Sequence, residues 1–175
     1  SKAKIETFLD LSSLEKEIHR VITNSLTIAD NATPELKEIR GKIKKLEAQL
    51  QQKIASLSFT YSTYLNDENA TIRDGHFVLP VKTSEKSKVM GIVYDVSSSG
   101  ATTFIEPMDI VQINNELTSL KVEEQEEIRK ILKALTALVL IQEKEIVNNN
   151  KIIGEFDFLS AKSLYAGIIN AEIAR

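Results

Sequence analysis

The stretch GIVYDVSSSGATTFIEP, residues 91–107, decides how this chain folds. Its β-branched and aromatic residues predict strands over 89–97 and 101–106, joined by a turn at Ser98-Ser99-Gly100. Pro107 suits the first position of a helix, and a long helical pattern follows it. The segments on both sides also have helical periodicity, so we expect a small β element between helices.

A second hairpin is predicted directly upstream. Asp74-Gly75 separates the strand-like residues 70–73 from residues 76–81, and a two-residue turn of this kind favours positive φ at both positions. The next residues, 82–88 (KTSEKSK), are polar and predict a loop. Two hairpins give a four-stranded β clamp over residues 70–106, which is close to the smallest sheet that can bury a face.

Two long helices are expected to flank the clamp and to pair as an antiparallel arm. The first has Thr33 as its capping residue and Pro34 as its first helical residue, and extends to about residue 65. Its apolar residues have the spacing of a coiled-coil seam: Leu36, Ile39, Ile43, Leu46, Leu50 and Leu57. The second runs from about 107 to 149, and its first seam consists of Ile110, Ile113, Leu117 and Leu120.

The remaining residues predict a helical bundle at the other end of the arm. Residues 128–146 are apolar on most sides, which is typical of a helix surrounded by others. Helices over about 12–26 and 156–172 are available to surround it. Asn148-Asn149-Asn150 and Gly154 are expected to form the turn into the last helix.

The predicted fold class is therefore mainly α with a small β insertion. It comprises a helical bundle base, a long antiparallel two-helix arm and a four-stranded β clamp at the tip of the arm. We expect residues 1–69 to hold the N-terminal helix and first arm helix, 70–106 the clamp, and 107–175 the second arm helix and C-terminal bundle helix. Because the chain starts at Ser1 and ends within a helix at Arg175, we expect a piece of a larger protein.

Composition excludes several classes of function. The 175 residues carry a net charge of −3, so nucleic acid would have to bind at a local basic patch. The absence of Cys excludes disulfides, thiol nucleophiles and Cys-type zinc sites. The longest apolar run, residues 137–141, is too short to cross a bilayer, and no signal peptide opens the chain. We expect no membrane contact and a cytoplasmic location.

The sequence also lacks catalytic motifs. Gly41-Lys42 has a leucine where the P-loop pattern needs its first glycine. His19 and His76 are not part of a recognisable triad or metal-ligand set, and we interpret both as surface residues. The carboxylates of Glu106 and Asp109 are explained by the positive end of the second long helix. We therefore expect no enzyme activity and no cofactor or metal in this chain.

The clamp residues resemble a known family. The stretch 91–107 with Asn114-Asn115-Glu116-Leu117, and the upstream residues 72–82 (IRDGHFVLPVK), are similar to the clamp region of the second bacterial MutS paralogue. That family is MutS-like but lacks the mismatch-recognition domain. Residues 156–162 (FDFLSAK) resemble the helix start that follows its lever arm. The similarity covers nearly the whole chain and is densest in 72–117 and 156–166.

This resemblance implies a lever-and-clamp segment that binds nucleic acid and is not catalytic. Its partner would be double-stranded or branched DNA, or the ribosome and its rRNA. The full-length protein would be a homodimer acting in mismatch repair, recombination or ribosome rescue. In the family, an ATPase domain that uses ATP and magnesium follows the lever, and a nuclease-like domain lies at the far C-terminus. This chain stops before both, and ATP-driven motion of the arms would open or close the clamp.

The candidate nucleic-acid site is a set of basic residues on the predicted clamp, here called the clamp cluster: Arg73, Lys82, Lys86 and Lys88. Flexible lysines on a projecting tip can neutralise phosphate charge without reading bases. They could equally be solvated charges that keep edge strands from aggregating, and the sequence leaves both interpretations open. The aromatic residues beside them, Phe77 and Tyr94, could both be buried, so sequence-specific recognition is not expected.

Two other features have simple structural interpretations. The hydroxyl-rich residues 97–103 could bind phosphate through backbone N–H groups, but we favour a turn whose hydroxyls satisfy its own backbone. Basic residues of 37–45 are expected to pair with acidic residues of 123–127 across the arm.

The alternative function is a prefoldin-like coiled-coil chaperone subunit, because such subunits also place two β-hairpins between two helices. The additional helices over 12–26 and 156–172, and the apolar residues 128–146, argue against it.

Overall fold

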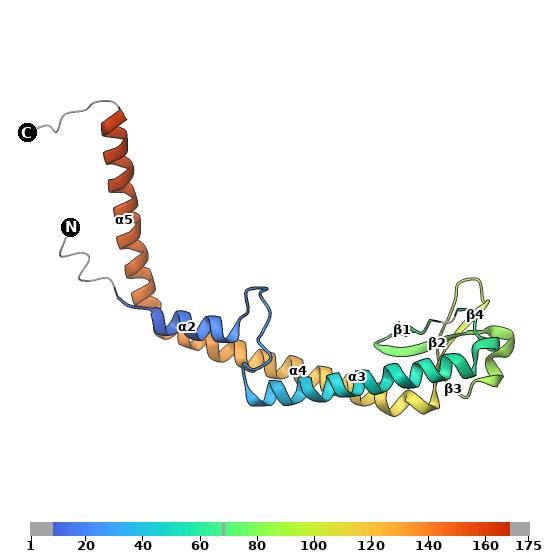
Figure 1. Ribbon diagram of the computed structural model, residues 1–175. Helices are drawn as coiled ribbons and strands as arrows, with labels where there is room; N and C mark the ends of the chain where they lie inside the picture. Colours follow the sequence, from blue (N-terminus) through green and yellow to red (C-terminus); the bar gives the residue numbers. More distant parts are fainter. Residues whose placement is uncertain (1–8, 68, 169–175) are drawn as a thin grey trace, which may run out of the picture. The chain divides into compact units, whose positions relative to one another are not determined.

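The computed structural model describes residues 9–67 and 69–168, and Figure 1 shows their helices and strands. The chain divides into two compact units. The clamp unit is Asp30–Arg129, and the terminal unit combines the residues up to Ala29 with those from Lys130 onward. No helix in the described residues is long and apolar enough to cross a membrane.

Two helices form the arm of the clamp unit. Helix α3, Pro34–Thr60, begins as predicted: Pro34 is in its first turn, and the Leu36 backbone N–H donates to Thr33 Oγ1 at 3.1 Å. It ends earlier than predicted, and a short 3-10 helix, η1 (Ser62–Tyr64), follows it. Helix α4, Met108–Ile141, begins directly after the sheet.

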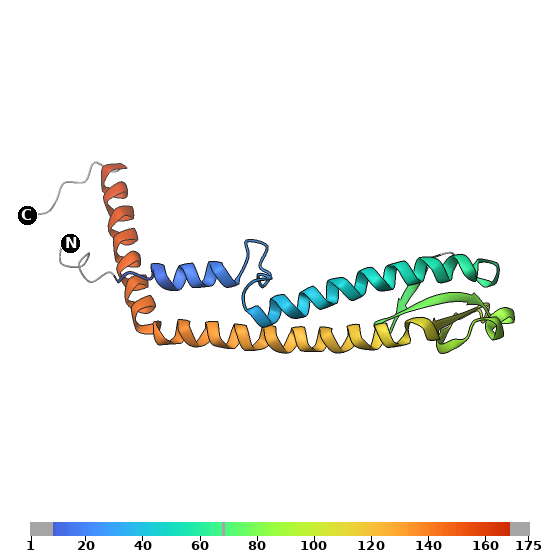
Figure 2. The same ribbon diagram turned by 60° about the horizontal axis from the view of Figure 1, so that its bottom comes forward.

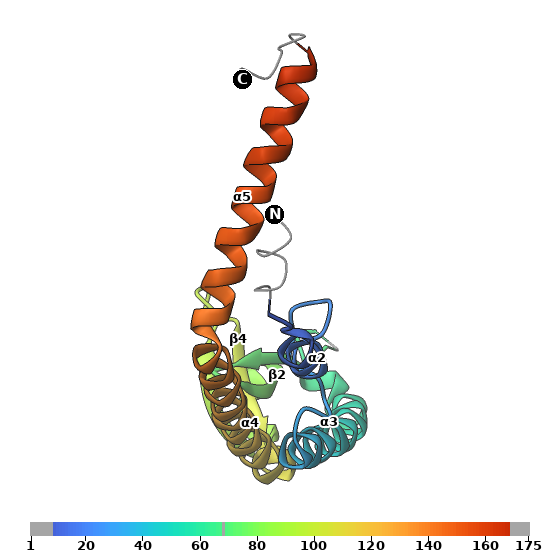
Figure 3. The same cartoon turned by 90° about the vertical axis from the view of Figure 1, so that its left-hand side faces the viewer.

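Helix α3 packs against the first part of α4, and the two lie side by side in Figure 3. The apolar cluster between them contains the predicted seam residues Ile43, Leu50, Ile110, Leu117 and Leu120. Polar contacts fix the antiparallel register: Thr33 Oγ1 donates to Glu127 Oε1 at 3.1 Å, and Arg40 Nε donates to Glu124 Oε1 at 2.7 Å. The expected charge pairing across the arm is thus present at Arg40.

The four predicted strands form one antiparallel sheet with the order β1-β2-β4-β3. Their bounds are Thr71–Arg73 for β1, His76–Lys82 for β2, Gly91–Val96 for β3 and Thr102–Pro107 for β4. Asp74 and Gly75 have positive φ angles of 48° and 82°, as the predicted two-residue turn requires. The fold class, mainly α with a small β insertion, is confirmed.

The sheet has a core of its own and lies beside the arm helices of its unit (Figure 2). This core consists of Leu65, Leu79, Val81, Val89 and Ile105. Residues 83–88, predicted as a loop, form a second 3-10 helix, η2 (Thr83–Lys88), which ends at buried Val89. At Gly91, a Cβ atom would lie 2.2 Å from the Glu106 carbonyl oxygen, so β3 can approach β4 this closely only with glycine there.

In the terminal unit, two predicted helix boundaries are wrong. Helix α2 is Ser12–Val21 instead of 12–26, because the chain turns back and Ile22 pairs with Ile28 in an isolated β-bridge. The break before the last helix falls at Gln142, and α5 spans Glu143–Ile168. The three asparagines predicted as a turn lie inside α5, where Asn149 hydrogen-bonds the backbone of Leu9.

The bundle expected around residues 128–146 is only partly present in the described residues. Ile131 and Leu135 are buried, but Leu140 and Ile141 are exposed. Helix α5 turns away from the end of α4 instead of folding back along it (Figure 2), and it exposes large apolar side chains. Its predicted residues beyond 168 lie outside the described part of the chain.

Candidate nucleic-acid interface

The clamp cluster does not form one continuous patch. Arg73 pairs with His76 across the β1–β2 hairpin, whereas Lys82 lies at the opposite end of β2. Lys82 lies six positions after His76 along the strand, which corresponds to about 20 Å. Lys86 and Lys88 follow Lys82 on η2. The three lysines are therefore neighbours in the fold, and Arg73 is not one of them.

Arg73 and Lys82 are engaged within the protein. The Arg73 guanidinium lies 4.0 Å from the centroid of the Phe104 ring, and its Nε lies 3.4 Å from Asp95 Oδ2. Lys82 Nζ donates to the Thr63 carbonyl oxygen of η1 at 2.9 Å. Phosphate contact by either side chain would compete with these interactions.

Lys86 and Lys88 are different, because both are exposed on η2. Within residues 9–67 and 69–168, neither ammonium group has a hydrogen-bond or ion-pair partner, and the intervening residue is the neutral Ser87. Their backbone is held in place by buried Val89 at the end of η2 and by Thr83, whose hydroxyl lies 3.0 Å from the Thr103 hydroxyl of β4. The structure therefore presents two available cations on a fixed backbone.

The hydroxyl-rich turn satisfies its own backbone, as we expected. The Thr102 N–H donates to Ser97 Oγ at 3.0 Å, and the Ala101 N–H lies 3.4 Å from Ser99 Oγ. The Gly100 N–H donates to the Ser97 carbonyl at 2.8 Å, and Gly100 has a φ of 71°. These contacts explain the serines and the glycine as turn formers.

A buried polar network is the feature that sequence reasoning missed. Glu106, which we expected to interact with the positive end of the second long helix, is 0% exposed. Its Oε1 accepts from His76 Nδ1 at 2.9 Å and from Asn114 Nδ2 of α4. The Tyr94 hydroxyl lies 3.0 Å from the same His76 nitrogen, and the two rings stack with centroids 5.0 Å apart.

This network joins three strands of the sheet to the first turns of α4. Burial, followed by the hydrogen bond and negative charge of Glu106, raises the pKa of Tyr94, because each of them disfavours the phenolate. The prediction that His76 is a surface residue is therefore wrong, because only 12% of its side chain is exposed. The available signal was Asn114, an amide placed one turn after Ile110 on the apolar face of the arm helix.

The network does not have the composition of a catalytic or metal site. His76 contacts a carboxylate and a phenol, and no serine nucleophile adjoins it in the described residues. No group of three or more His, Cys, Asp or Glu residues there could hold a metal ion. The network is best explained as a structural connection between the sheet and α4.

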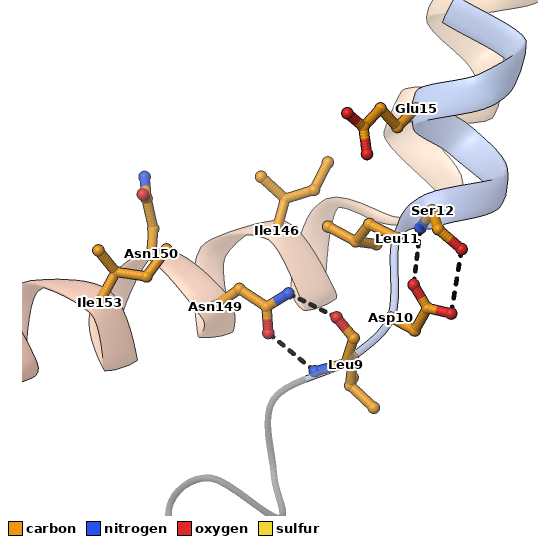
Figure 4. A pocket seen from close by; sticks show the side chains of 9 residues that line it. All are labelled: Leu9, Asp10, Leu11, Ser12, Glu15, Ile146, Asn149, Asn150 and Ile153. Carbon is orange, nitrogen blue, oxygen red and sulfur yellow. Dashed lines mark hydrogen bonds between the residues drawn. The ribbon is translucent and has the colours of Figure 1, made fainter.

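A pocket of about 410 Å³ in the terminal unit also has a structural explanation (Figure 4). It lies between the start of α2 and the first turns of α5, and Leu11, Ile146 and Ile153 are among its apolar lining residues. Asn149 is satisfied by two hydrogen bonds to Leu9, at 3.0 Å to the N–H and 2.8 Å to the carbonyl. This amide attaches Leu9 to α5, so its role in the pocket is structural.

Comparisons with known proteins identify relatives with a consistent name. No family model matches the chain. Endonuclease MutS2 of Clostridium beijerinckii is 42% identical over 161 residues, which cover 92% of this chain and 20% of that protein. Endonuclease MutS2 of Clostridioides difficile is 44% identical over 151 residues, covering 85% and 19%. Endonuclease MutS2 of Thermotoga maritima is 38% identical over 173 residues, covering 97% and 23%.

The chain thus spans about one fifth of the length of the curated relatives it matches. These relatives give no support to the prefoldin-like alternative, and the four strands complete one sheet within a single chain. The resemblance drawn from the clamp residues 72–117 and from residues 156–166 is confirmed: the chain corresponds to a segment of the MutS2 proteins.

Proposed function

We propose that this chain is the non-catalytic lever-and-clamp segment of a MutS2 protein, and that its clamp contacts the nucleic-acid backbone without reading sequence. The name Endonuclease MutS2 supports a nucleic-acid partner for the full-length relatives. The segment itself supplies a packed two-helix arm and a four-stranded sheet that Glu106, His76 and Asn114 join to α4, which suits a mechanical role better than a chemical one.

The observation that carries this proposal is the contrast within the clamp cluster. Lys86 and Lys88 are exposed and have no partner in the described residues, whereas Arg73 and Lys82 hold other parts of the clamp together. When unpaired ammonium groups on a fixed backbone neutralise phosphates, the nucleic acid releases its counterions, and this release favours binding. Contacts of this kind fix position on the duplex and carry no sequence information.

In this proposal the arm transmits motion to the clamp. Helix α4 begins at the sheet, and Asn114 connects it to Glu106 and His76, so the first turns of α4 and the sheet would move together. The parent protein would be a homodimer whose ATPase domain, with ATP and magnesium, drives that motion in the cytoplasm. The ligand would be double-stranded or branched DNA, or the rRNA of the ribosome.

The test is a salt series with labelled duplex DNA and a structured RNA. The variant is Lys86→Ala/Lys88→Ala, which leaves the structural contacts of Lys82 and Arg73 intact. Losing two phosphate contacts should weaken binding and make the slope of log K against log salt shallower by about 1.8 for duplex DNA, since each contact contributes about 0.9.

The matched control is Lys44→Ala/Lys45→Ala, which removes the same charge from exposed positions of α3. An equal change of slope in both variants would mean that net charge alone matters and would refute a clamp contact. If only the Lys86→Ala/Lys88→Ala variant changes the slope, the nucleic acid that the unmodified chain binds more tightly indicates whether DNA or structured RNA is the ligand.

A further inference from the structure

One aromatic ring of the clamp unit is almost fully exposed. Phe59, in the last turn of α3, has 85% of its surface accessible, although the apolar seam of that helix is buried close by at Leu50. A single exposed apolar side chain is common on protein surfaces and needs no explanation by itself. Its surroundings are what distinguish Phe59.

Phe59 forms one wall of a shallow pocket of about 330 Å³. The other lining residues are Ala55 and Ser58 of α3, Ser62 of η1, and Asn69. Ser58 Oγ is buried and has no hydrogen-bond partner in the described residues. Because this oxygen is closed to solvent, the polar side chains that the pocket offers a ligand are those of Ser62 and Asn69.

A cation lies beside this pocket. Lys82 Nζ is bound to the carbonyl oxygen of Thr63, the residue that follows Ser62 of the pocket lining. The pocket therefore combines an exposed aromatic face with hydroxyl and amide groups, and Lys82, which stays hydrogen-bonded to Thr63, adds positive charge nearby. A nucleotide carries the matching groups, namely a flat base with a polar edge and a phosphate.

We propose that Phe59 is a stacking platform for an unpaired nucleobase, with Ser62 and Asn69 beside the edge of the base. This inference rests on the proposed function and extends it, because among the nucleic acids proposed there it selects those that present an unpaired base to Phe59. A base inside a regular duplex is stacked on both faces and cannot present one to Phe59. The clamp then prefers bulged, branched or single-stranded nucleic acid.

The test compares two labelled probes, a fully paired duplex and the same duplex with a short unpaired bulge. Phe59→Ala should weaken binding to the bulged probe about tenfold, because the shortened side chain can no longer stack on the unpaired base. Binding to the paired duplex should not change. Phe59→Trp, which keeps an aromatic face, should preserve the preference for the bulge. Met90→Ala is the control, since Met90 is similarly exposed on the clamp unit and does not line this pocket.

Direct contact is tested with 5-iodouracil at the unpaired position, followed by ultraviolet crosslinking and peptide mapping. The expected crosslink is to the peptide that contains Phe59. If both probes bind equally well and Phe59→Ala changes neither, the stacking inference is overturned while backbone binding stands. If neither probe binds at low salt, the proposed function is overturned, and the inference with it.

Discussion

The clamp unit and the terminal unit contain similar apolar residues, but the clamp unit buries its seam residues and the terminal unit leaves several apolar side chains exposed. In the clamp unit, seam residues such as Ile43, Leu50 and Ile110 are buried in one apolar cluster. In the terminal unit, Leu140 is 62% exposed and Phe158 is 67% exposed. The first unit thus completes its core within one chain, whereas the second carries apolar surface that the described residues do not cover.

The largest effect is expected from shortening a seam residue. Leu50→Ala should lower the free energy of unfolding by about 3 kcal/mol, since it removes a fully buried side chain and leaves a cavity. Leu140→Ala should change it by less than about 0.5 kcal/mol in the isolated chain. Urea denaturation of both variants measures the difference. Equal losses would mean that Leu140 is covered in solution.

The buried network should give the next largest effect. Glu106→Ala leaves His76 and Asn114 without their shared acceptor inside the clamp unit, so we expect a loss of about 2–3 kcal/mol. The control is Glu116→Ala, which removes an exposed carboxylate from α4, the helix that carries Asn114. Little change in stability is expected for it. If urea denaturation gave both variants the stability of the unmodified chain, the network would not hold the sheet to α4.

Two glycine substitutions in the clamp unit should change stability in opposite directions. One should destabilise the chain by an intermediate amount, and the other should stabilise it. Gly91→Ala forces a Cβ against the Glu106 carbonyl, and we expect it to destabilise the sheet by about 1–3 kcal/mol. Gly41→Ala lies in α3 with nothing within 4 Å of the new Cβ, and should stabilise the chain by about 0.5–1 kcal/mol. Thermal unfolding of the two variants should shift in opposite directions. A Gly91→Ala variant at least as stable as the unmodified chain would contradict the close approach of β3 and β4.

The smallest effect is the pH dependence of Tyr94. Its pKa is raised in the folded protein, so the folded state holds the phenolic proton more tightly than the unfolded chain does. The stability linked to this proton is complete below the usual tyrosine pKa, near 10, and is lost as pH rises through the raised pKa. Tyrosinate absorbance, compared with a Tyr94→Phe variant, should show one tyrosine that ionises late. If the subtracted signal titrated like free tyrosine, Tyr94 would not adjoin the Glu106 charge.

Local chemistry made much of the clamp unit predictable. Asp74-Gly75 fixes its hairpin because few residue pairs accept positive φ twice, and Thr33-Pro34 fixes the start of α3 because capping and the missing proline N–H act within one turn. The heptad spacing identified the arm because its partner seam lies in the same chain. The turn, the helix start and the spacing within each seam all depend on residues a few positions apart, so each of them can be identified from the sequence alone.

Tertiary contacts decided the remainder. Asn149 is helical instead of part of a turn, because its amide is satisfied by the distant backbone of Leu9. Glu106 is buried because His76 and Asn114 meet it there. The same holds for the candidate site. The sequence identified its basic residues, but only the fold showed that Arg73 and Lys82 already have partners within the protein. Composition and periodicity describe what a side chain can do, whereas its partners depend on segments that the fold brings together.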